Sequence, residues 1–241
     1  MKTVVTSDFH IKFYENNEDK ERRVRVEDFL KSLINNIDCL ILAGDIFDLW
    51  IEWNTVIIKN YYSILKIFSD LRNSGCKIIF ITGNHDFYLD NFLVDIIGCE
   101  VYKDYYTTQI DGKKIFVSHG DLFTKNDNRY KIFRSVIRSP FIRYLCKIIH
   151  PDIILKLGNC MSRTKKQNDF DKNYNKKEQG LIEKAVLLSN DFDIIVFGHS
   201  HKPMCLNINN SIYLNCGDWI QHNSFVYIHD AVATLKKQKL N

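Results

Sequence analysis

The chain has 241 residues, of which 45% are hydrophobic and 26% charged, a composition typical of a globular protein with one large domain or two small ones. Its 10 Gly and 3 Pro exclude collagen-like, linker-rich and disordered classes, and no apolar run approaches the roughly 18 residues that a membrane span needs. The formal net charge is only +4, and the seven Cys lie apart without a Cys-x-x-Cys pair, which indicates reduced thiols in a cytosolic protein.

Strand-like and helix-like segments alternate along the chain. Residues 1–5 lead straight into a strand-like run rather than through the apolar core of a signal peptide, so we expect the protein not to be secreted. Continuous apolar runs, typical of strands covered on both faces, lie at 3–5, 39–42, 77–81, 115–117, 194–197, 212–214 and 225–228. Apolar stripes at helical spacing lie at 26–37, 57–71 (with Gly75 as a helix stop) and 181–188. This alternation predicts an α/β fold with an at least partly parallel sheet.

A basic segment interrupts this alternation between two of the strands. Residues 129–166 contain ten Lys or Arg and one acid, a net charge of +9, which leaves −5 for the rest of the chain. Apolar stripes separated by Pro140 and Pro151 predict two or three short amphipathic helices there, and the polar stretch 165–178 predicts a loop. We therefore expect a single domain over 1–241 with a basic helical lid insertion over 124–178. Such a charge block indicates a localised anionic partner: phosphate, nucleic acid or a membrane surface.

Polar residues follow five of the predicted strands at their carboxyl ends. They are Asp8 and His10, Asp45 and Asp48, Asn84 and His85, His119, and His199 and His201. Because the carboxyl ends of strands form the ligand crevice of an α/β sheet, we expect these side chains to meet at one rim. Each of these motifs alone is more often part of a turn or a helix cap. Five of them in series, which together contain five of the eight His, predict a binding site.

The donor types at this rim indicate a metal centre. Carboxylate, imidazole and amide donors suit Mn, Fe or Zn, and the lack of a thiolate among them disfavours a structural zinc site. Seven such donors are more than one catalytic ion can bind while it keeps a coordination position open for the substrate. They suit two ions roughly 3.5–4 Å apart that share one carboxylate. Such a pair lowers the pKa of a bridging water and holds a phosphoryl group for in-line attack.

The motifs D-x-H, G-D-x-x-D, G-N-H-D, H-G-D and G-H-x-H occur in this order, and in this combination the chain resembles the calcineurin-like metallophosphoesterase superfamily over essentially its whole length. The resemblance implies a four-layer αββα double β-sandwich with two divalent ions, Mn²⁺ being expected and Fe or Zn the alternatives. It implies two ligand sets and a bridge between them: Asp8, His10 and His201; Asn84, His119 and His199; and the bridging Asp45. Catalytic roles at the scissile phosphate would fall to Asn84 and to His85, the latter as general acid or oxyanion stabiliser. Asp48 either supports a ligand or is a turn residue.

Residues 44–50 (Gly-Asp-Ile-Phe-Asp-Leu-Trp), the basic insertion with its 150–152 and 162–163 stretches, and the Gly-Asp-Trp at 217–219 are similar to a narrower family. That family is the UDP-2,3-diacylglucosamine pyrophosphatases of lipid A biosynthesis. Its members hydrolyse the pyrophosphate of a UDP-sugar that carries two acyl chains, and they release UMP and the acylated sugar 1-phosphate, lipid X. The best-known members have Arg where this chain has His85, and other branches keep His.

The insertion suits such a substrate, because its apolar stripes can receive acyl chains and its cations can bind a diphosphate. The stripe residues are Phe141, Ile142, Leu145 and Ile149, and the expected substrate contacts are Asp127 (or an Asx turn), Ser162, Arg163 and Lys165. The same helices suit an anionic membrane, so we expect a cytoplasmic protein, peripheral to the inner membrane. The alternative is that the stripes only pack on the domain.

Two other functions stay open. The first is a metallophosphoesterase that acts on a nucleotide, cyclic nucleotide, phosphoprotein or nucleic acid. The basic segment alone suits nucleic acid, but its apolar stripes argue against that partner, so we expect no nucleic-acid partner. The second is a non-catalytic interaction module, which missing ligands would indicate, whereas all seven positions are occupied. We expect His150, His222 and His229 to be non-catalytic, and Trp50, Trp53 and Trp219 to serve packing.

Overall fold

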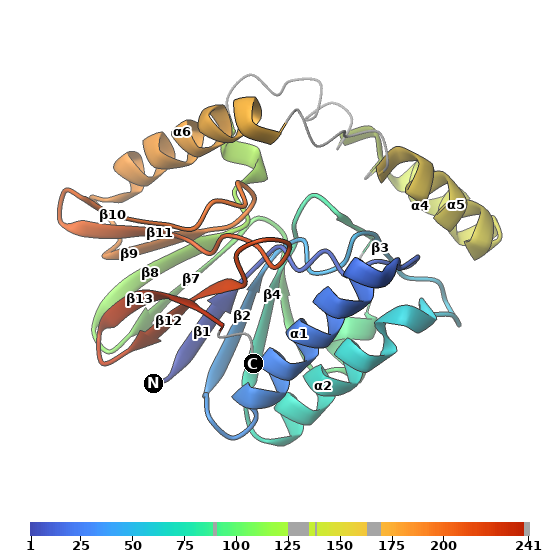
Figure 1. Ribbon diagram of the computed structural model, residues 1–241, viewed down its shortest axis with the longest axis horizontal. Coiled ribbons are helices and arrows are strands. Elements are labelled where there is room, and N and C mark those ends of the chain that lie inside the picture. The colour runs from blue at the N-terminus through green and yellow to red at the C-terminus, as the bar shows by residue number, and fades with distance from the viewer. Residues whose placement is uncertain (89–90, 125–134, 138, 163–169, 239–241) are drawn as a thin grey trace.

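Two sheets stacked face to face form the centre of the molecule (Figure 1), a computed structural model that describes the backbone of residues 1–88, 91–124, 135–137, 139–162 and 170–238. The six-stranded sheet has the order β13-β12-β1-β2-β4-β6. Its strands are Val232–Lys237, Ser224–His229, Thr3–Thr6, Cys39–Ala43, Lys77–Ile81 and Glu100–Tyr102. Strands β1, β2, β4 and β6 run parallel, and β12 and β13 close one edge antiparallel.

The five-stranded sheet has the order β10-β11-β9-β8-β7. Its strands are Met204–Ile208, Ser211–Asn215, Ile194–Phe197, Lys113–Ser118 and Tyr105–Ile110. The central strands β8, β9 and β11 are parallel, and both edge strands are antiparallel to their neighbours. A third, small sheet pairs β3 (Trp50–Ile51) with β5 (Asp86–Tyr88).

Alternate residues of each central strand face opposite layers, which is why these strands are continuous apolar runs. In β1, Val5 joins the core between the two sheets together with Val117 and Val196 of the second sheet. Its neighbour Val4 points the other way, into the core under the outer helices with Leu30. Both faces of the strands are therefore buried, and the predicted αββα order of layers is confirmed.

Helices cover the outer face of each sheet (Figure 1). α1 (Asn17–Leu33) and α2 (Tyr62–Asn73) cover the six-stranded sheet, and α6 (Phe170–Leu188) covers the five-stranded sheet with Leu181 and Ala185. α1 begins at a capping box in which Asn16 Oδ1 accepts from the Asp19 amide at 2.8 Å. α2 ends before Gly75, whose φ of 88° confirms the predicted helix stop. Short helical turns are η1 (Lys59–Tyr61), η2 (Phe92–Ile96) and η3 (Asp121–Phe123).

The basic segment contains α4 (Pro140–Ile148) and α5 (Pro151–Ser162), two of the short helices predicted there, and each of them begins at a proline. The indole Nε1 of Trp53 donates to the carbonyl of Cys146 at 2.9 Å, and Cys146 and Leu155 join the core under α1 and α2. A Cβ on Gly158 would lie 2.8 Å from Leu49 Cδ2, so α5 packs closely on the residue that precedes β3. The hairpin of α4 and α5 is thus docked on the body beside the second motif.

The predicted loop at 165–178 is wrong for residues 170–178, which form the first turns of α6; residues 165–169 lie outside the described part of the chain. The stretch 170–178 contains three Lys and Glu178, which are good helix formers once the following turns pack on a sheet. Among the described helices, none is long and apolar enough to cross a membrane.

Candidate metal centre

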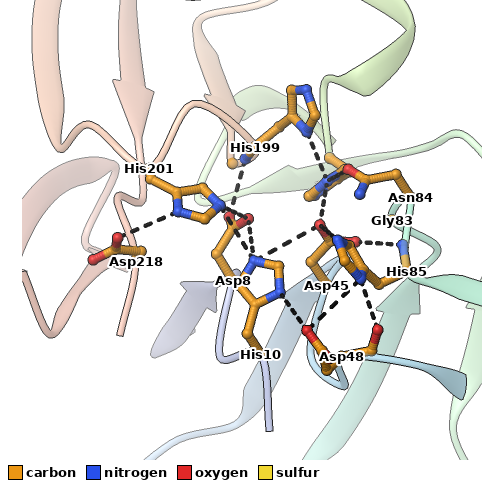
Figure 2. A network of polar contacts seen from close by, with 12 residues as sticks. Asp8, His10, Asp45, Asp48, Gly83, Asn84, His85, His199, His201 and Asp218 are labelled. Carbon is orange, nitrogen blue, oxygen red and sulfur yellow. Dashed lines mark hydrogen bonds and ion pairs between the residues drawn. The ribbon is translucent and has the colours of Figure 1, made fainter. Parts of the chain in front are cut away.

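Five loops meet at one end of the two sheets (Figure 2). They follow β1, β2 and β4 of the first sheet and β8 and β9 of the second. Because these strands are parallel within each sheet, their carboxyl ends point the same way and deliver their side chains to one place. The structure brings together Asp8, His10, Asp45, Asp48, Asn84, His85, His119, His199 and His201.

The first predicted ligand set closes on one point. The Nε2 atoms of His10 and His201 lie 3.2 Å apart, and Asp8 Oδ1 lies 3.2 Å from the same atom of His201 and 3.6 Å from that of His10. All three side chains are buried or nearly so, Asp8 completely. Two imidazole nitrogens that face each other at this distance can share one proton, or both can coordinate one cation through their lone pairs.

The second set closes in the same way. His119 Nε2 lies 3.1 Å from Asn84 Oδ1 and 3.2 Å from His199 Nδ1. Asp45 Oδ2 lies 3.3 Å from His119 Nε2 and 3.9 Å from His10 Nε2, so this one oxygen faces both sets. Four imidazoles, two carboxylates and one amide oxygen, turned inward and without a thiolate, fit two divalent ions of the Mn, Fe or Zn type.

The loops reach this arrangement through a left-handed backbone. Five of the seven predicted ligands have positive φ: Asp8 (56°), His10 (46°), Asp45 (54°), His199 (64°) and His201 (60°). Asp and His are among the non-glycine residues that adopt this region most readily, and such residues gather at functional sites. A Cβ on Gly83 would lie 2.3 Å from Asp45 Oδ1, so only glycine lets the third loop approach the carboxylate of Asp45 this closely.

Buried partners outside the two sets orient the ligands. His119 Nδ1 donates to the carbonyl of Ala43 at 2.9 Å, which leaves the lone pair of Nε2 available to a cation. Asp218 Oδ2 lies 3.4 Å from His201 Nδ1 and orients that ring in the same way. Asp86 Oδ2 accepts from the amides of Gly83 at 2.7 Å and Asp45 at 3.2 Å, and so joins the second and third loops. The sequence does not predict these roles of Asp86 and Asp218, although Asp86 ends the G-N-H-D motif and Asp218 lies in the Gly-Asp-Trp at 217–219.

His85 lies at the open side of the centre with 30% of its side chain exposed. Its Nδ1 lies 2.7 Å from the carbonyl of Asp48, to which only a protonated nitrogen can donate, so Nε2 is the atom free to meet a ligand. The carboxylate of Asp48 accepts from Lys12 Nζ at 2.7 Å and lies 4.0 Å from His10 Nδ1. Of the two readings of Asp48, the structure favours support of the histidines.

Burial and ion pairs shift the pKa values of the centre in opposite directions. Burial alone would raise the pKa of Asp45, but the imidazoles of His119 and His85 hold it well below its usual range. For His119, burial lowers the pKa, yet the charge of Asp45 outweighs it and the pKa rises to about 10. For His201, the charges of Asp8 and Asp218 likewise outweigh burial, and the pKa rises to about 9. Burial lowers the pKa of His199 well below its usual value.

These shifts predict that metal binding releases protons. With pKa values of about 10 and 9, His119 and His201 are protonated at neutral pH in the metal-free protein, and both must become neutral to bind a cation. Near pH 7 we expect Mn²⁺ binding to release about two protons, and the Mn²⁺ affinity to increase as the pH rises toward 9. Titration calorimetry in buffers of different ionisation enthalpy measures the proton count, and an identical heat in every buffer would contradict the prediction.

The other predicted residues lie elsewhere. Asp127, Arg163 and Lys165 fall outside the described residues, and Ser162 ends α5 with its side chain not described, so these substrate contacts stay predictions. Trp219 is fully buried and stacks edge-on to Phe9, in keeping with packing. His222, predicted to be non-catalytic, donates through its backbone amide to Asp218 at 3.0 Å and thus contacts the partner of a predicted ligand.

The chain is similar in sequence and fold to known proteins. The family model for calcineurin-like phosphoesterases matches residues 1–203. A protein of Porphyromonas gingivalis named UDP-2,3-diacylglucosamine hydrolase is 26% identical over 249 residues (93% of this chain and 92% of the relative), and one of the same name from Vibrio atlanticus is 27% identical over 242 residues (93% and 92%). The solved structure of an archaeal phosphodiesterase aligns with a TM-score of 0.50 at 17% identity, covering 98% of this chain and 99% of its own, which is a likeness of fold.

Proposed function

The chain belongs to the calcineurin-like phosphoesterase family, and on that premise we propose that it is a two-metal hydrolase that cleaves the pyrophosphate of UDP-2,3-diacylglucosamine to UMP and 2,3-diacylglucosamine 1-phosphate. It is a metal-dependent hydrolase. The observation that carries the proposal is the convergence of seven inward-facing donors in two sets with one carboxylate oxygen between them. Relatives named for this substrate, aligned over most of both chains, supply the choice of substrate.

The seven donors divide between the two ions. One ion would be held by Asp8, His10 and His201, the other by Asn84, His119 and His199, with Asp45 shared. Mn²⁺ is the ion that we propose, since imidazole and carboxylate together suit it. When bound, the two ions supply Lewis acidity, which ionises water and offsets the charge of the phosphoryl oxygens. We assign Asp45 as the shared ligand because its Oδ2 lies 3.3 Å from His119 Nε2 of one set and 3.9 Å from His10 Nε2 of the other.

His85 is the residue of this chain that we propose to act on the substrate directly. Its amide donates to Asp45 Oδ1 at 2.8 Å, so its position is tied to the shared ligand. The carbonyl of Asp48 fixes Nδ1, and Nε2, 3.9 Å from Asp45 Oδ2, is directed at the open side of the centre. From there the imidazolium form, which carries a proton on both nitrogens, can donate from Nε2 to a phosphate oxygen as charge develops, as general acid or oxyanion stabiliser.

The reaction is tested with the purified full chain, loaded with Mn²⁺ and given UDP-2,3-diacylglucosamine. We expect mass spectrometry to identify UMP and the diacylated sugar 1-phosphate, with no turnover after removal of the ions by a chelator and recovery on return of Mn²⁺. Cyclic nucleotides and oligonucleotides, offered in parallel, test the alternative substrates. Efficient cleavage of those compounds, with the diacyl sugar untouched, would move the assignment to another phosphoester.

The hairpin of α4 and α5 supports the acyl part of the proposal. Its inner side packs on the body, where Ile142 lies half-buried against the core under α1 and α2. Its outer side carries large apolar side chains that are more than half exposed: Phe141, Tyr144 and Ile148 of α4, and Ile153 and Leu157 of α5. Exposure of so much apolar surface on two adjacent helices marks an interaction site, and we propose that it receives the acyl chains.

Polar substitutions on this outer side should separate acyl binding from chemistry. We expect Phe141→Ser to raise KM for the diacylated substrate about tenfold, because burial of an aromatic ring contributes roughly 1.5 kcal/mol or more. Turnover of bis(p-nitrophenyl) phosphate, which has no acyl chains, should not change. Val232→Ser on β13, also more than half exposed, is the matched control. An equal loss on both substrates would mean that Phe141 serves the fold instead.

We also propose that this outer side rests on the membrane that holds the substrate, at the cytoplasmic face of the inner membrane. Arg143, Lys147 and Lys156 lie on the same two helices, and cations beside apolar side chains suit the headgroup region of an anionic bilayer. Flotation with anionic vesicles should recover the protein, and the Phe141→Ser variant should float less. Equal recovery with purely zwitterionic vesicles would contradict the part assigned to charge.

A further inference from the structure

A buried carboxylate lies behind the metal centre and takes no part in the chemistry proposed above. Glu178 of α6 is 3% exposed, and its two oxygens accept from two hydroxyls. The Ser200 hydroxyl donates to Oε2, and the Tyr213 hydroxyl donates to Oε1 at 2.6 Å. A carboxylate in such a place costs several kcal/mol unless hydrogen bonds compensate it, so its presence between a helix and a sheet calls for a reason.

Ser200 occupies a central place in the fifth loop. It separates His199, which belongs to one predicted ligand set, from His201, which belongs to the other. Both neighbours have left-handed backbones, with φ of 64° and 60°, so the local preferences of the chain do not favour this loop shape. Contacts with the rest of the fold have to hold it.

Three hydrogen bonds to Glu178 and Asn215 hold the loop, two at the hydroxyl of Ser200 and one at the carbonyl of Gly198. Asn215 Nδ2 donates to the Ser200 hydroxyl at 3.0 Å and to the carbonyl of Gly198 at 2.9 Å, while the same hydroxyl donates to Glu178. The Lys202 amide also donates to this hydroxyl, at 3.4 Å, so the hydroxyl of Ser200 donates once and accepts twice and its rotamer is fixed. The rings on either side reach their partners at 3.2 Å, His10 in one set and His119 in the other.

We propose that Glu178 is a positioning residue for the metal centre, acting through Ser200 on the placement of His199 and His201. The inference deepens the proposed function and rests on it only for the presence of two ions. Because Glu178 belongs to α6, the helix that follows the basic segment in the chain, it also ties that helix to both ligand sets at once. Residues that orient metal ligands affect affinity strongly even though they never touch the ion.

The test is Mn²⁺ affinity, measured by calorimetry on the full chain after chelation. Glu178→Gln keeps the volume but removes the charge and replaces one of the two accepting oxygens by an NH2 group, which cannot accept from a hydroxyl. We expect it to weaken Mn²⁺ binding about tenfold to a hundredfold. Ser200→Ala, which removes the intermediate hydroxyl, should weaken Mn²⁺ binding to a similar extent. The double variant should bind Mn²⁺ only slightly more weakly than either single variant, because both changes remove the same Ser200–Glu178 hydrogen bond.

A destabilised helix alone has to be distinguished from a lost positioning contact. Ala185→Gly weakens α6 at a buried site of the same helix without touching the fifth loop, and should lower Tm while leaving Mn²⁺ affinity unchanged. If Glu178→Gln behaves like that control, the proposal is overturned. If Glu178→Gln does not fold, Ser200→Ala decides: unchanged Mn²⁺ affinity in that variant overturns the proposal equally.

The readout does not depend on the substrate. Should the unmodified chain bind Mn²⁺ and leave UDP-2,3-diacylglucosamine intact, the proposed reaction fails, and the affinities of the two variants still decide the role of Glu178. Should the variants bind Mn²⁺ like the unmodified chain while the reaction proceeds, only the positioning role fails.

Discussion

Replacement of Asp45 by Asn is expected to reduce hydrolysis at saturating Mn²⁺ about a thousandfold or more. The shared oxygen, Oδ2, lies 3.3 Å from His119 Nε2 and 3.9 Å from His10 Nε2, and the other oxygen accepts from the His85 amide at 2.8 Å. An amide offers one neutral oxygen in place of two anionic ones and cannot serve all three. The lost charge stabilisation is several kcal/mol, and about 4 kcal/mol corresponds to a thousandfold in rate.

The fold should survive this change. His119, whose pKa of about 10 depends on the charge of Asp45, can respond by giving up its proton, so that no charge is left buried alone. Circular dichroism and Tm of the metal-free variant check this, with Asp28→Asn on the exposed side of α1 as the control for loss of a carboxylate. Undiminished turnover by the Asp45→Asn protein would refute the assignment of the shared ligand.

Gly83→Ala should lower kcat about a hundredfold without any change in a charged group. The new Cβ would lie 2.3 Å from Asp45 Oδ1 and 2.4 Å from the amide of the same residue, both far inside contact distance. Either the third loop or the shared ligand has to move by roughly 1 Å, and displacements of that size at a catalytic centre cost about a hundredfold. Steady-state kinetics on bis(p-nitrophenyl) phosphate measure the effect free of acyl binding.

Gly75→Ala is the matched control for this prediction. Gly75 has a φ of 88° at the end of α2, and a Cβ there would meet nothing within 4 Å. A side chain in this conformation costs about 1 kcal/mol of stability and leaves the metal centre alone. A Gly75→Ala protein should therefore melt earlier at full kcat, whereas Gly83→Ala should lose kcat; similar kcat values for the two would show that the close approach at Gly83 does not matter.

The central strands and the candidate metal centre could be predicted from the sequence because their signals are local. Each of β1, β2, β4, β8 and β9 is an apolar run that ends in a polar motif, and the parallel arrangement converts five local signals into one site. Strands β3 and β5 of the small sheet escaped prediction, and so did β6, β7, β10 and β13 of the two large sheets. The last four lie at sheet edges, where one side faces solvent, and exposed positions in β7 and β13 break any continuous apolar run.

The contacts behind the ligands could not be predicted, because they join residues far apart in the sequence. Glu178 lies in a polar stretch where nothing in the sequence distinguishes it from the polar residues beside it, and its partners are 22 and 35 residues further along the chain. Asp218 was recognisable only as part of a motif, and its contact with His201 depends on how β11 places the following loop. Burial of a charged group is a property of the assembled layers, which no local pattern records.

The five left-handed residues of the centre have a consequence for how this chain can change over time. Each such conformation costs a non-glycine residue roughly 1–2 kcal/mol, a cost that the backbone bears whether or not the centre is in use. A descendant that abandoned the reaction would be released from the constraint, and drift toward Gly or Asn at these sites would make it more heat-resistant. Catalysis and thermal tolerance thus compete for the same five positions, and engineering for robustness should begin elsewhere in the molecule.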